Sequence, residues 1–206
     1  MKLERVEPSK RKAGRVLVYL EDGTLLRCTE RELLSFGLRA GDELDAAALK
    51  ALKEAAAGSG TREEAAALIG RRAMSRADLV RKLRERGASC READAAAEWL
   101  EAIGALNDAD YAAALVRRCA GSFYGPARCR EELRRHGIDR NLWDEALAAA
   151  PSPQELIGRY LTDRFRARAV DALELRRASD ALARRGFSWA DVRPALAAYT
   201  DDLPEE

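Results

Sequence analysis

The chain has 206 residues, with 36 lysines and arginines against 35 aspartates and glutamates, and a single histidine, His136. The balanced charge excludes a polybasic tail and an acidic disordered segment, and one histidine excludes a His-rich metal site or a two-histidine zincin motif. Alanine supplies 41 residues, whereas glycine and proline supply only 14 and 6, so we expect several small helical units rather than one thick core.

Strand-forming composition is confined to residues 15–28. Residues 15–21 (RVLVYLE) are rich in β-forming side chains, and Asp22-Gly23 is a strong signal for a hairpin turn. Residues 24–28 (TLLRC) can then return antiparallel to the first strand. Because an isolated two-stranded hairpin is only marginally stable, we expect this one to pack on the helices that follow it or on a partner.

Helices and a linker are predicted after the hairpin. Thr29 is placed to cap a helix that begins at Glu30, and a second helix is predicted over residues 45–57. The Gly-Ser-Gly segment at residues 58–60 is the clearest linker in the chain, so residues 1–58 are expected to form an N-terminal hairpin and helix domain. Thr61 and Glu64 then form a capping box that opens a helix to about residue 73.

Everything after the predicted linker has the 3.6-residue period of helices, and it repeats. A Leu-x-x-x-Gly motif occurs at residues 83–87, 133–137 and 182–186, each time at the end of a short basic helix. Each glycine is interpreted as a helix stop with a left-handed backbone conformation. The fold class predicted is mainly α, with tandem three-helix repeats forming an elongated, curved module. The expected repeats span residues 61–107, 108–150 and 152–200.

Three motifs in this region are specific in their order and spacing. A basic helix begins at Ser75, a G-x-L-x-D-x-x-Y-A junction begins at Gly104, and a second Leu-x-x-x-Gly unit follows Gly125. Over residues 65–147 the chain resembles the RecX family, regulators of the RecA recombinase. The motif residues, which we assign to the scaffold, are Leu79, Leu83, Gly87, Leu106, Asp108, Tyr111, Gly125, Leu133 and Gly137.

The resemblance implies a regulator that binds RecA and its nucleoprotein filament. Such a regulator usually hinders filament growth, ATP hydrolysis and strand exchange in recombination, DNA repair and the SOS response. The N-terminal hairpin resembles an extension carried by some members of the family. Alanine replaces larger apolar residues at several positions of the first repeat. This departure puts in question the affinity for the partner rather than membership of the family.

Arginine clusters on the predicted helices are the candidate contacts with RecA or with DNA. One hypothesis is a basic stripe that meets acidic protein surface or DNA phosphates, and the other is that arginines simply fill solvated helix faces. An alternative function is a helix-turn-helix-like module that acts directly on DNA, although the balanced charge is unusual for a dedicated DNA-binding protein. The aromatic residues, Trp189 among them, are expected mainly at core positions. The candidate partner-binding residues are Arg71, Arg72, Arg81, Arg84, Arg117, Arg118, Arg130, Arg134, Arg176, Arg177 and Arg184.

No catalytic motif is present in the sequence. It contains neither a G-x-x-x-x-G-K-[ST] phosphate loop nor a G-x-S-x-G nucleophile elbow. His136 directly precedes the Gly137 stop, where a cation near a helix C-terminus is favoured, so we assign it to the helix end rather than to base catalysis. We therefore predict a protein that is not an enzyme and that needs no cofactor and no metal.

The cysteines and the first residues indicate where the protein acts. The four cysteines are separated by 62, 29 and 10 residues and contain no C-x-x-C pair, which favours reduced thiols in a cytosol over a zinc site or a disulfide scaffold. Residues 1–15 lack the apolar stretch of a signal peptide, and no run approaches the roughly 20 apolar residues of a membrane helix. We expect a cytoplasmic protein, without a membrane contact, that acts as a monomer.

Overall fold

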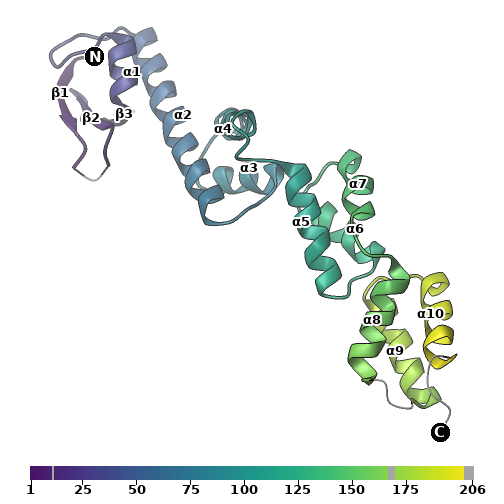
Figure 1. The fold of residues 1–206 in the computed structure, drawn as a ribbon. Coiled ribbons are helices and arrows are strands. Elements are labelled where there is room, and N and C mark those ends of the chain that lie inside the picture. Colours follow the sequence, from purple (N-terminus) through teal and green to yellow (C-terminus); the bar gives the residue numbers. More distant parts are fainter. Residues whose placement is uncertain (11, 167–169, 202–206) are drawn as a thin grey trace. The chain divides into compact units, whose positions relative to one another are not determined.

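Helices make up most of the structure, a computed structural model that describes residues 1–10, 12–166 and 170–201 (Figure 1). One three-stranded antiparallel sheet lies near the N-terminus. The chain divides into two compact units, Met1–Ala73 with Asp78–Leu106, and Met74–Ala77 with Asn107–Glu206. The predicted mainly helical fold with a small N-terminal β region is thereby confirmed.

The sheet contains one strand more than the sequence predicted. β2 (Arg15–Leu20) and β3 (Leu25–Thr29) form the predicted hairpin, and β1 (Leu3–Pro8) pairs antiparallel with β2 on its other side. A bulge between Leu3 and Arg5 shifts the register, so β1 lacks a regular alternation of apolar and polar residues. The third strand adds the pairing that an isolated hairpin would lack.

The sheet packs on the two helices that follow it. Thr29 caps α1 (Glu30–Phe36) as predicted: its hydroxyl accepts a hydrogen bond from the amide of Glu32, and the Glu32 carboxylate accepts one from the Thr29 amide. Leu33 of α1 and Leu52 of α2 (Ala46–Arg71) are buried in one apolar cluster with side chains of the sheet. The hairpin therefore packs on the two helices that follow it in the chain.

Helix α2 runs without interruption through residues 58–60, so the predicted linker is wrong. The predicted capping box is wrong as well, because Thr61 lies inside the helix and its hydroxyl donates a hydrogen bond to the carbonyl oxygen of Ala57. A helical glycine costs only about 1 kcal/mol relative to alanine. Contacts between the sheet and this part of α2 offset that free-energy cost.

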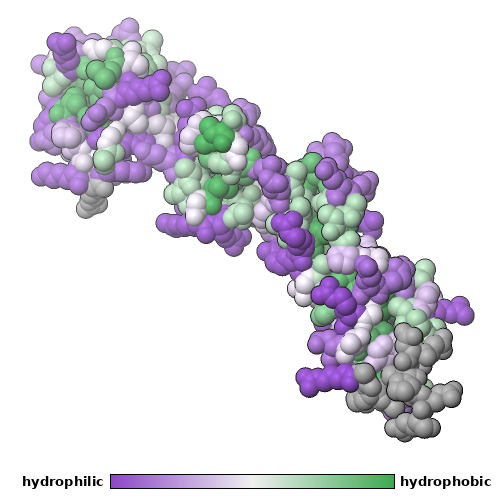
Figure 2. Space-filling model, viewed as in Figure 1, coloured by the Kyte–Doolittle hydropathy of each residue, from purple (hydrophilic) through white to green (hydrophobic). Residues whose placement is uncertain are grey.

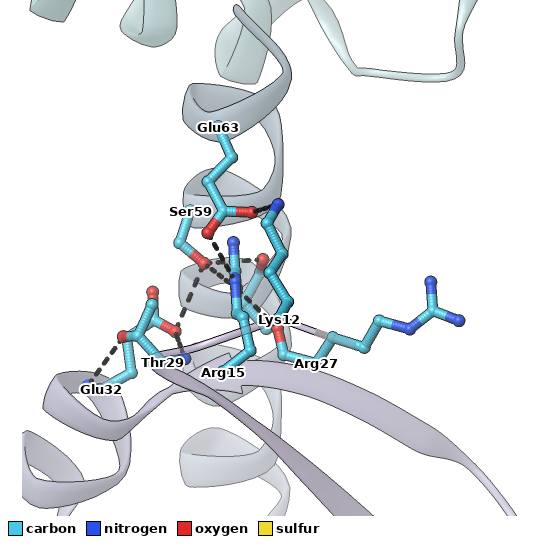
Figure 3. Close-up of polar contacts among 8 residues, drawn as sticks. Lys12, Arg15, Arg27, Thr29, Glu32, Ser59 and Glu63 are labelled. Atoms are coloured by element: carbon cyan, nitrogen blue, oxygen red, sulfur yellow. Dashed lines mark hydrogen bonds and ion pairs between the residues drawn. The ribbon is translucent and has the colours of Figure 1, made fainter. Parts of the chain in front are cut away.

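Arg15, at the start of β2, supplies those contacts (Figure 3). Its side chain is 4% exposed; Nε donates to Glu63 Oε1 at 2.8 Å, and one terminal nitrogen donates to Ser59 Oγ at 2.8 Å and to the Arg27 carbonyl oxygen at 2.9 Å. Lys12 also bonds the Glu63 carboxylate. Burial acts to raise the pKa of Glu63, but the hydrogen bonds and charges of Arg15 and Lys12 outweigh it, so this pKa lies below its usual value. The glycine-containing segment thus docks the sheet instead of acting as a hinge.

In the rest of the first unit, α3 (Arg76–Glu85) precedes α4 (Cys90–Ala102), and α4 packs on α2. Ser89 caps α4 in a capping box with Glu92. The buried side chains of α4 are mostly alanines, which allow a close approach to α2. At the surface, Arg86, just after α3, pairs with Glu64 of α2 at 2.7 Å, and Arg91 of α4 pairs with Glu54 of α2 at 3.1 Å.

The second unit contains two apolar clusters, each surrounded by helices. Leu115, Leu133 and Ile138 belong to the first cluster, and Ile157, Phe165 and others belong to the second. The helices around the first are α5 (Asp108–Gly121), α6 (Pro126–Arg135), the 3-10 turn η1 (Arg140–Leu142) and α7 (Trp143–Ala148). The helices around the second are α8 (Pro153–Phe165), α9 (Ala172–Arg184) and α10 (Trp189–Asp201).

The three Leu-x-x-x-Gly motifs adopt the predicted helix-stop geometry. Gly87, Gly137 and Gly186 have φ values of +99°, +66° and +87°. In each motif the amide that follows the glycine donates a hydrogen bond of 3.1–3.2 Å to the carbonyl oxygen of the motif leucine. That bond is the six-to-one bond of a Schellman cap, and all three leucines are fully buried.

Candidate partner-binding surface

The second unit joins helix α6 to helix α9 end to end. The Gly125 amide, at the start of α6, donates to the carbonyl oxygen of Arg185 at 2.8 Å, and the Ala127 amide donates to that of Gly186 at 3.2 Å. A Cβ atom at Gly125 would lie only 2.5 Å from the Gly186 carbonyl carbon. Backbone amides at the start of α6 are thus satisfied by backbone carbonyls at the end of α9 and in the turn after it.

The same kind of joint occurs at the first turn of α3, which belongs to this unit. Ser75 donates its hydroxyl hydrogen bond to the carbonyl oxygen of His136 at 2.5 Å, and a Cβ at Gly137 would lie 2.5 Å from Ala77 Cβ. Asp108 accepts a hydrogen bond from the Arg76 amide at 2.7 Å. Several motif residues therefore lie in joints between helix ends, as a scaffold role requires.

Helix α6 presents arginines of two kinds. Glu132 is buried and pairs with Arg128 at 3.2 Å and with Arg135 at 2.6 Å, so these contacts hold the helix surface together. Arg134 bonds Glu131 at 2.5 Å, a bond that lowers the pKa of the Glu131 carboxyl. Arg130 is exposed and makes no ion pair with another described residue.

Helix α3 carries Arg81 and Arg84. The Arg81 side chain is 57% exposed and bonds the buried carboxylate of Asp78 at 2.6 Å, with Glu85 at 3.8 Å. Arg84 is exposed in the last turn of the helix. Arg81 is therefore partly neutralised by its own helix, and Arg84 is the more available cation.

The remaining candidate arginines are all exposed, and they lie on three elements. Arg71 ends α2 and Arg72 is its C-cap residue, Arg117 and Arg118 lie near the end of α5, and Arg176, Arg177 and Arg184 lie on α9. Hydrophilic side chains are prominent on the visible face of Figure 2, with smaller apolar areas between them.

Alignment of these charges along the repeats is partial. Arg84 and Arg134 each stand three residues before a motif glycine, but the third repeat has Ala183 there. Glu131 and Asp180 occupy the positions that correspond to Arg81. The repeats therefore do not place an arginine at every equivalent position.

Trp189 is an exposed aromatic residue that the sequence analysis misassigned to the core. It is 65% exposed at the start of α10, whereas Val192, one turn later, is 1% exposed. The repeat register contained the signal: Trp189 follows its motif glycine by three residues, as the exposed Arg140 follows Gly137. Exposed tryptophan is enriched in the contacts that dominate protein interfaces, so Trp189 joins the candidate contacts.

A pocket of about 330 Å³ opens beside α6. Arg130 and Asp144 supply charge at its lining, and Tyr124, Cys129 and Leu147 supply part of its mostly apolar wall. Within the described ranges, His, Cys, Asp and Glu side chains form no group of three or more that could hold a metal ion. No helix in the described part of the chain is long and apolar enough to span a membrane.

The sequence of this chain is similar to a family model and to known proteins. The model of the family described as "RecX, second three-helix domain" matches residues 107–147. A protein named "Regulatory protein RecX" from Xanthomonas oryzae pv. oryzae (strain MAFF 311018) is 40% identical over 138 residues, which are 65% of this chain and 84% of the relative. Its namesake from Stenotrophomonas maltophilia (strain R551-3) is 38% identical over 146 residues, 68% of this chain and 87% of the relative.

Two solved structures share the fold. One, described as "Crystal structure of regulatory protein RecX", has a TM-score of 0.71 at 24% identity and matches 98% of this chain and 99% of its own. The other, "Crystal structure of RecX from Lactobacillus salivarius", has a TM-score of 0.60 at 19% identity, with 70% and 97% matched. The first match extends over nearly the whole chain, the N-terminal sheet included.

Proposed function

Because the chain belongs to the RecX family of regulatory proteins, we propose that it binds the RecA recombinase and its nucleoprotein filament. Binding inhibits filament growth, ATP hydrolysis and strand exchange, and so regulates recombination and DNA repair in the cytoplasm. The single observation that carries this proposal is the 40% identity to a regulatory protein RecX over 84% of that relative.

The exposed arginines of α3, α5, α6 and α9 are the proposed contacts. Arginine forms bidentate hydrogen bonds with carboxylates and is enriched at interfaces, so these side chains suit acidic surface on successive RecA protomers. Arg130 is the strongest candidate among them, because no carboxylate of its own helix neutralises it and an apolar pocket lies beside it. An interface needs both features, since charge guides association and apolar contact stabilises the complex.

Direct action on DNA is the alternative function. Its support is the same set of exposed arginines, but the whole chain has a formal net charge of only +1. A dedicated DNA-binding domain usually has a clear basic excess on one face. Binding to single- and double-stranded DNA should be measured across a salt titration. Tight binding at physiological salt with a steep salt dependence would favour the alternative, whereas weak binding lost above low salt favours RecA as the partner.

A pull-down with RecA filaments tests the proposal. Filaments assembled on immobilised single-stranded DNA with a slowly hydrolysed ATP analogue should retain the protein, and the same DNA without RecA should retain much less. Equal retention on both resins would contradict RecA as the partner.

A further inference from the structure

The sheet near the N-terminus has one face on the apolar core and one face outward. Val16, Val18 and Leu20 of β2 are buried in the cluster that they share with α1 and α2. Because successive side chains of a strand point to opposite faces, Leu17 and Tyr19 lie on the outward face, and both are half-buried. The solvent-facing side of an antiparallel sheet is usually polar, whereas the central strand of this sheet has an aliphatic and an aromatic side chain there.

Tyr19 is the centre of the first of two cross-strand rows on this face. Its partners in the strand register are Arg5 of β1 and Leu25 of β3. The guanidinium carbon of Arg5 lies over the Tyr19 ring, 4.2 Å from the ring centroid. The Arg5 side chain is 58% exposed and Leu25 is 41% exposed. This row therefore presents a cation, an aromatic ring and an aliphatic side chain next to one another.

Leu17 is the centre of the second row. Its partners in the register are Glu7 of β1 and Arg27 of β3. Glu7 pairs with Arg5 at 3.4 Å, which connects the two rows. Arg27 is exposed, and Figure 3 shows its side chain extending away from the contacts of Arg15. Arg27 is therefore the more available cation of the face.

Charge is distributed unevenly along the first 60 residues. Residues 1–29, which form the sheet and its turns, contain seven lysines and arginines against four aspartates and glutamates, whereas residues 30–60 contain four against six. Two of the seven cations bind Glu63, but Arg27 and Lys10, in the turn after β1, are exposed. The near-neutral total charge thus contains a basic sheet, and a local basic excess attracts a polyanion.

A partner that fits this face combines flat apolar groups with negative charge. Single-stranded DNA has both, because its unpaired bases stack on aromatic rings and on arginine guanidinium groups while its phosphates bind lysine and arginine. Duplex DNA keeps its base faces stacked inside the helix. Three strands span about 10 Å, and the two rows lie about 7 Å apart along the strands, so the face has room for about two bases.

We propose that the outward face of the sheet binds single-stranded DNA through Arg5, Leu17, Tyr19, Leu25 and Arg27. One base stacks on the Tyr19 ring and the guanidinium that covers it, and an adjacent base packs on the two leucines. Arg27 and Lys10 bind phosphates. This contact goes beyond the proposed regulation of RecA, does not rest on it and uses none of the helix arginines.

The small number of cations at the face limits the affinity for DNA. Each phosphate contact on a single strand contributes about −0.7 to the slope of log affinity against log salt, so two or three contacts give a slope of about −2. Non-specific contacts of this kind have dissociation constants of about 1–100 μM. We therefore expect measurable binding at low salt that weakens as salt is added.

The site can be mapped on the unaltered chain in the absence of RecA. An oligothymidine that carries 5-iododeoxyuridine is bound at low salt and irradiated, and the protein is then digested with trypsin. Cleavage after Arg15 and Arg27 releases peptide 16–27, in which Tyr19 is the only aromatic residue. We expect the DNA adduct on this peptide. Adducts confined to other peptides would overturn the proposal.

Fluorescence anisotropy of a labelled oligothymidine tests the role of the ring. Tyr19→Leu keeps an apolar side chain but removes the stacking surface, so it should weaken binding by at least about fivefold. Arg31→Ala, an exposed charge removal on α1, is the control and should bind as the wild type does. Equal affinity of Tyr19→Leu and the wild type would contradict the proposed stacking. Since the crosslinking map uses the unaltered chain, a poorly folded variant leaves that measurement intact.

Competition distinguishes DNA from an acidic protein segment as the occupant. Unlabelled oligothymidine should displace the labelled strand, and poly-glutamate at the same concentration of charge should displace it much less. Equal displacement by poly-glutamate, or by duplex DNA, would overturn single-stranded DNA as the ligand of this face. None of these measurements contains RecA, so their failure and a failure of the proposed regulation are distinguishable.

Discussion

The backbone amide of Gly125 donates a 2.8 Å hydrogen bond to the carbonyl oxygen of Arg185, and this contact fixes the start of one helix on the end of another. A related contact links Ser75 to the carbonyl of His136. In two of the three motifs, the carbonyl oxygen of the residue before the glycine thus accepts a hydrogen bond from the start of another helix. These two motifs form a joint as well as a helix stop, whereas a Cβ at Gly87 would meet open space.

Gly125→Ala should destabilise the protein by about 1–3 kcal/mol, the usual cost of overpacking. Gly125 has a φ of −77°, so the cost comes from the close approach of Gly186 and not from its own backbone conformation. The free energy of unfolding, obtained by urea denaturation, measures this loss of stability. Gly158→Ala is the matched control: that glycine is helical with open space around it, and alanine there should stabilise by about 0.5–1 kcal/mol. Equal stability of Gly125→Ala and the wild type would contradict the tight joint.

Arg15→Met should destabilise the first unit by about 2 kcal/mol or more, since Ser59, Glu63 and the Arg27 carbonyl lose a buried donor together. Thermal and urea unfolding followed by circular dichroism report the change. Arg5→Met is the control: that arginine is 58% exposed in its pair with Glu7, and an exposed pair contributes about 0–1 kcal/mol. Similar losses in the two variants would show that Arg15 does not anchor α2.

Charge reversal at Arg130 together with Arg134 should raise the concentration needed to inhibit RecA by about tenfold or more, equivalent to ~1.4 kcal/mol of binding. The same reversal at Arg81 and Arg84 tests α3. The helical circular dichroism of the Arg130 and Arg134 variant should stay intact, because both side chains are exposed. The Arg81 and Arg84 variant also removes a partner of the buried Asp78, so its free energy of unfolding is measured alongside. Arg39→Glu, an exposed change between α1 and α2, is the control and should inhibit as the wild type does. Full inhibition by both double variants would show that RecA contacts another surface of the protein.

Trp189→Ala should weaken RecA binding while changing the free energy of unfolding by only about 0.5 kcal/mol, because the side chain is 65% exposed. Trp143→Ala provides the contrast. Its indole packs in the apolar cluster of the second unit and donates to the Ile138 carbonyl oxygen at 2.9 Å, so its loss should cost about 2–4 kcal/mol. Calorimetry of RecA binding and urea unfolding separate the two effects. Unchanged affinity in Trp189→Ala would remove this residue from the interface.

Local chemistry made much of the fold predictable. The turn at Asp22-Gly23, the Thr29 cap and the three leucine-glycine helix stops each follow from a side chain or a backbone conformation that few residues supply. The family resemblance rests on the same local signals. These features need no knowledge of distant contacts, and the structure confirms them.

Tertiary contacts decided the features that could not be predicted from the sequence. Residues 58–60 have the composition of a linker, but Arg15 binds Ser59 from the sheet and the helix continues. The bulge in β1 removed the alternation that would have marked a strand. Trp189 was assigned from its apolar character rather than from its place in the repeat, which corresponds to the exposed Arg140.

Regulation of RecA is tested most directly by the rate of ATP hydrolysis by RecA on single-stranded DNA, measured while this protein is titrated from far below to above the RecA concentration. We expect substoichiometric amounts to slow hydrolysis, because each bound molecule blocks filament growth or bridges several protomers. A rate that stays unchanged across the whole titration would contradict it.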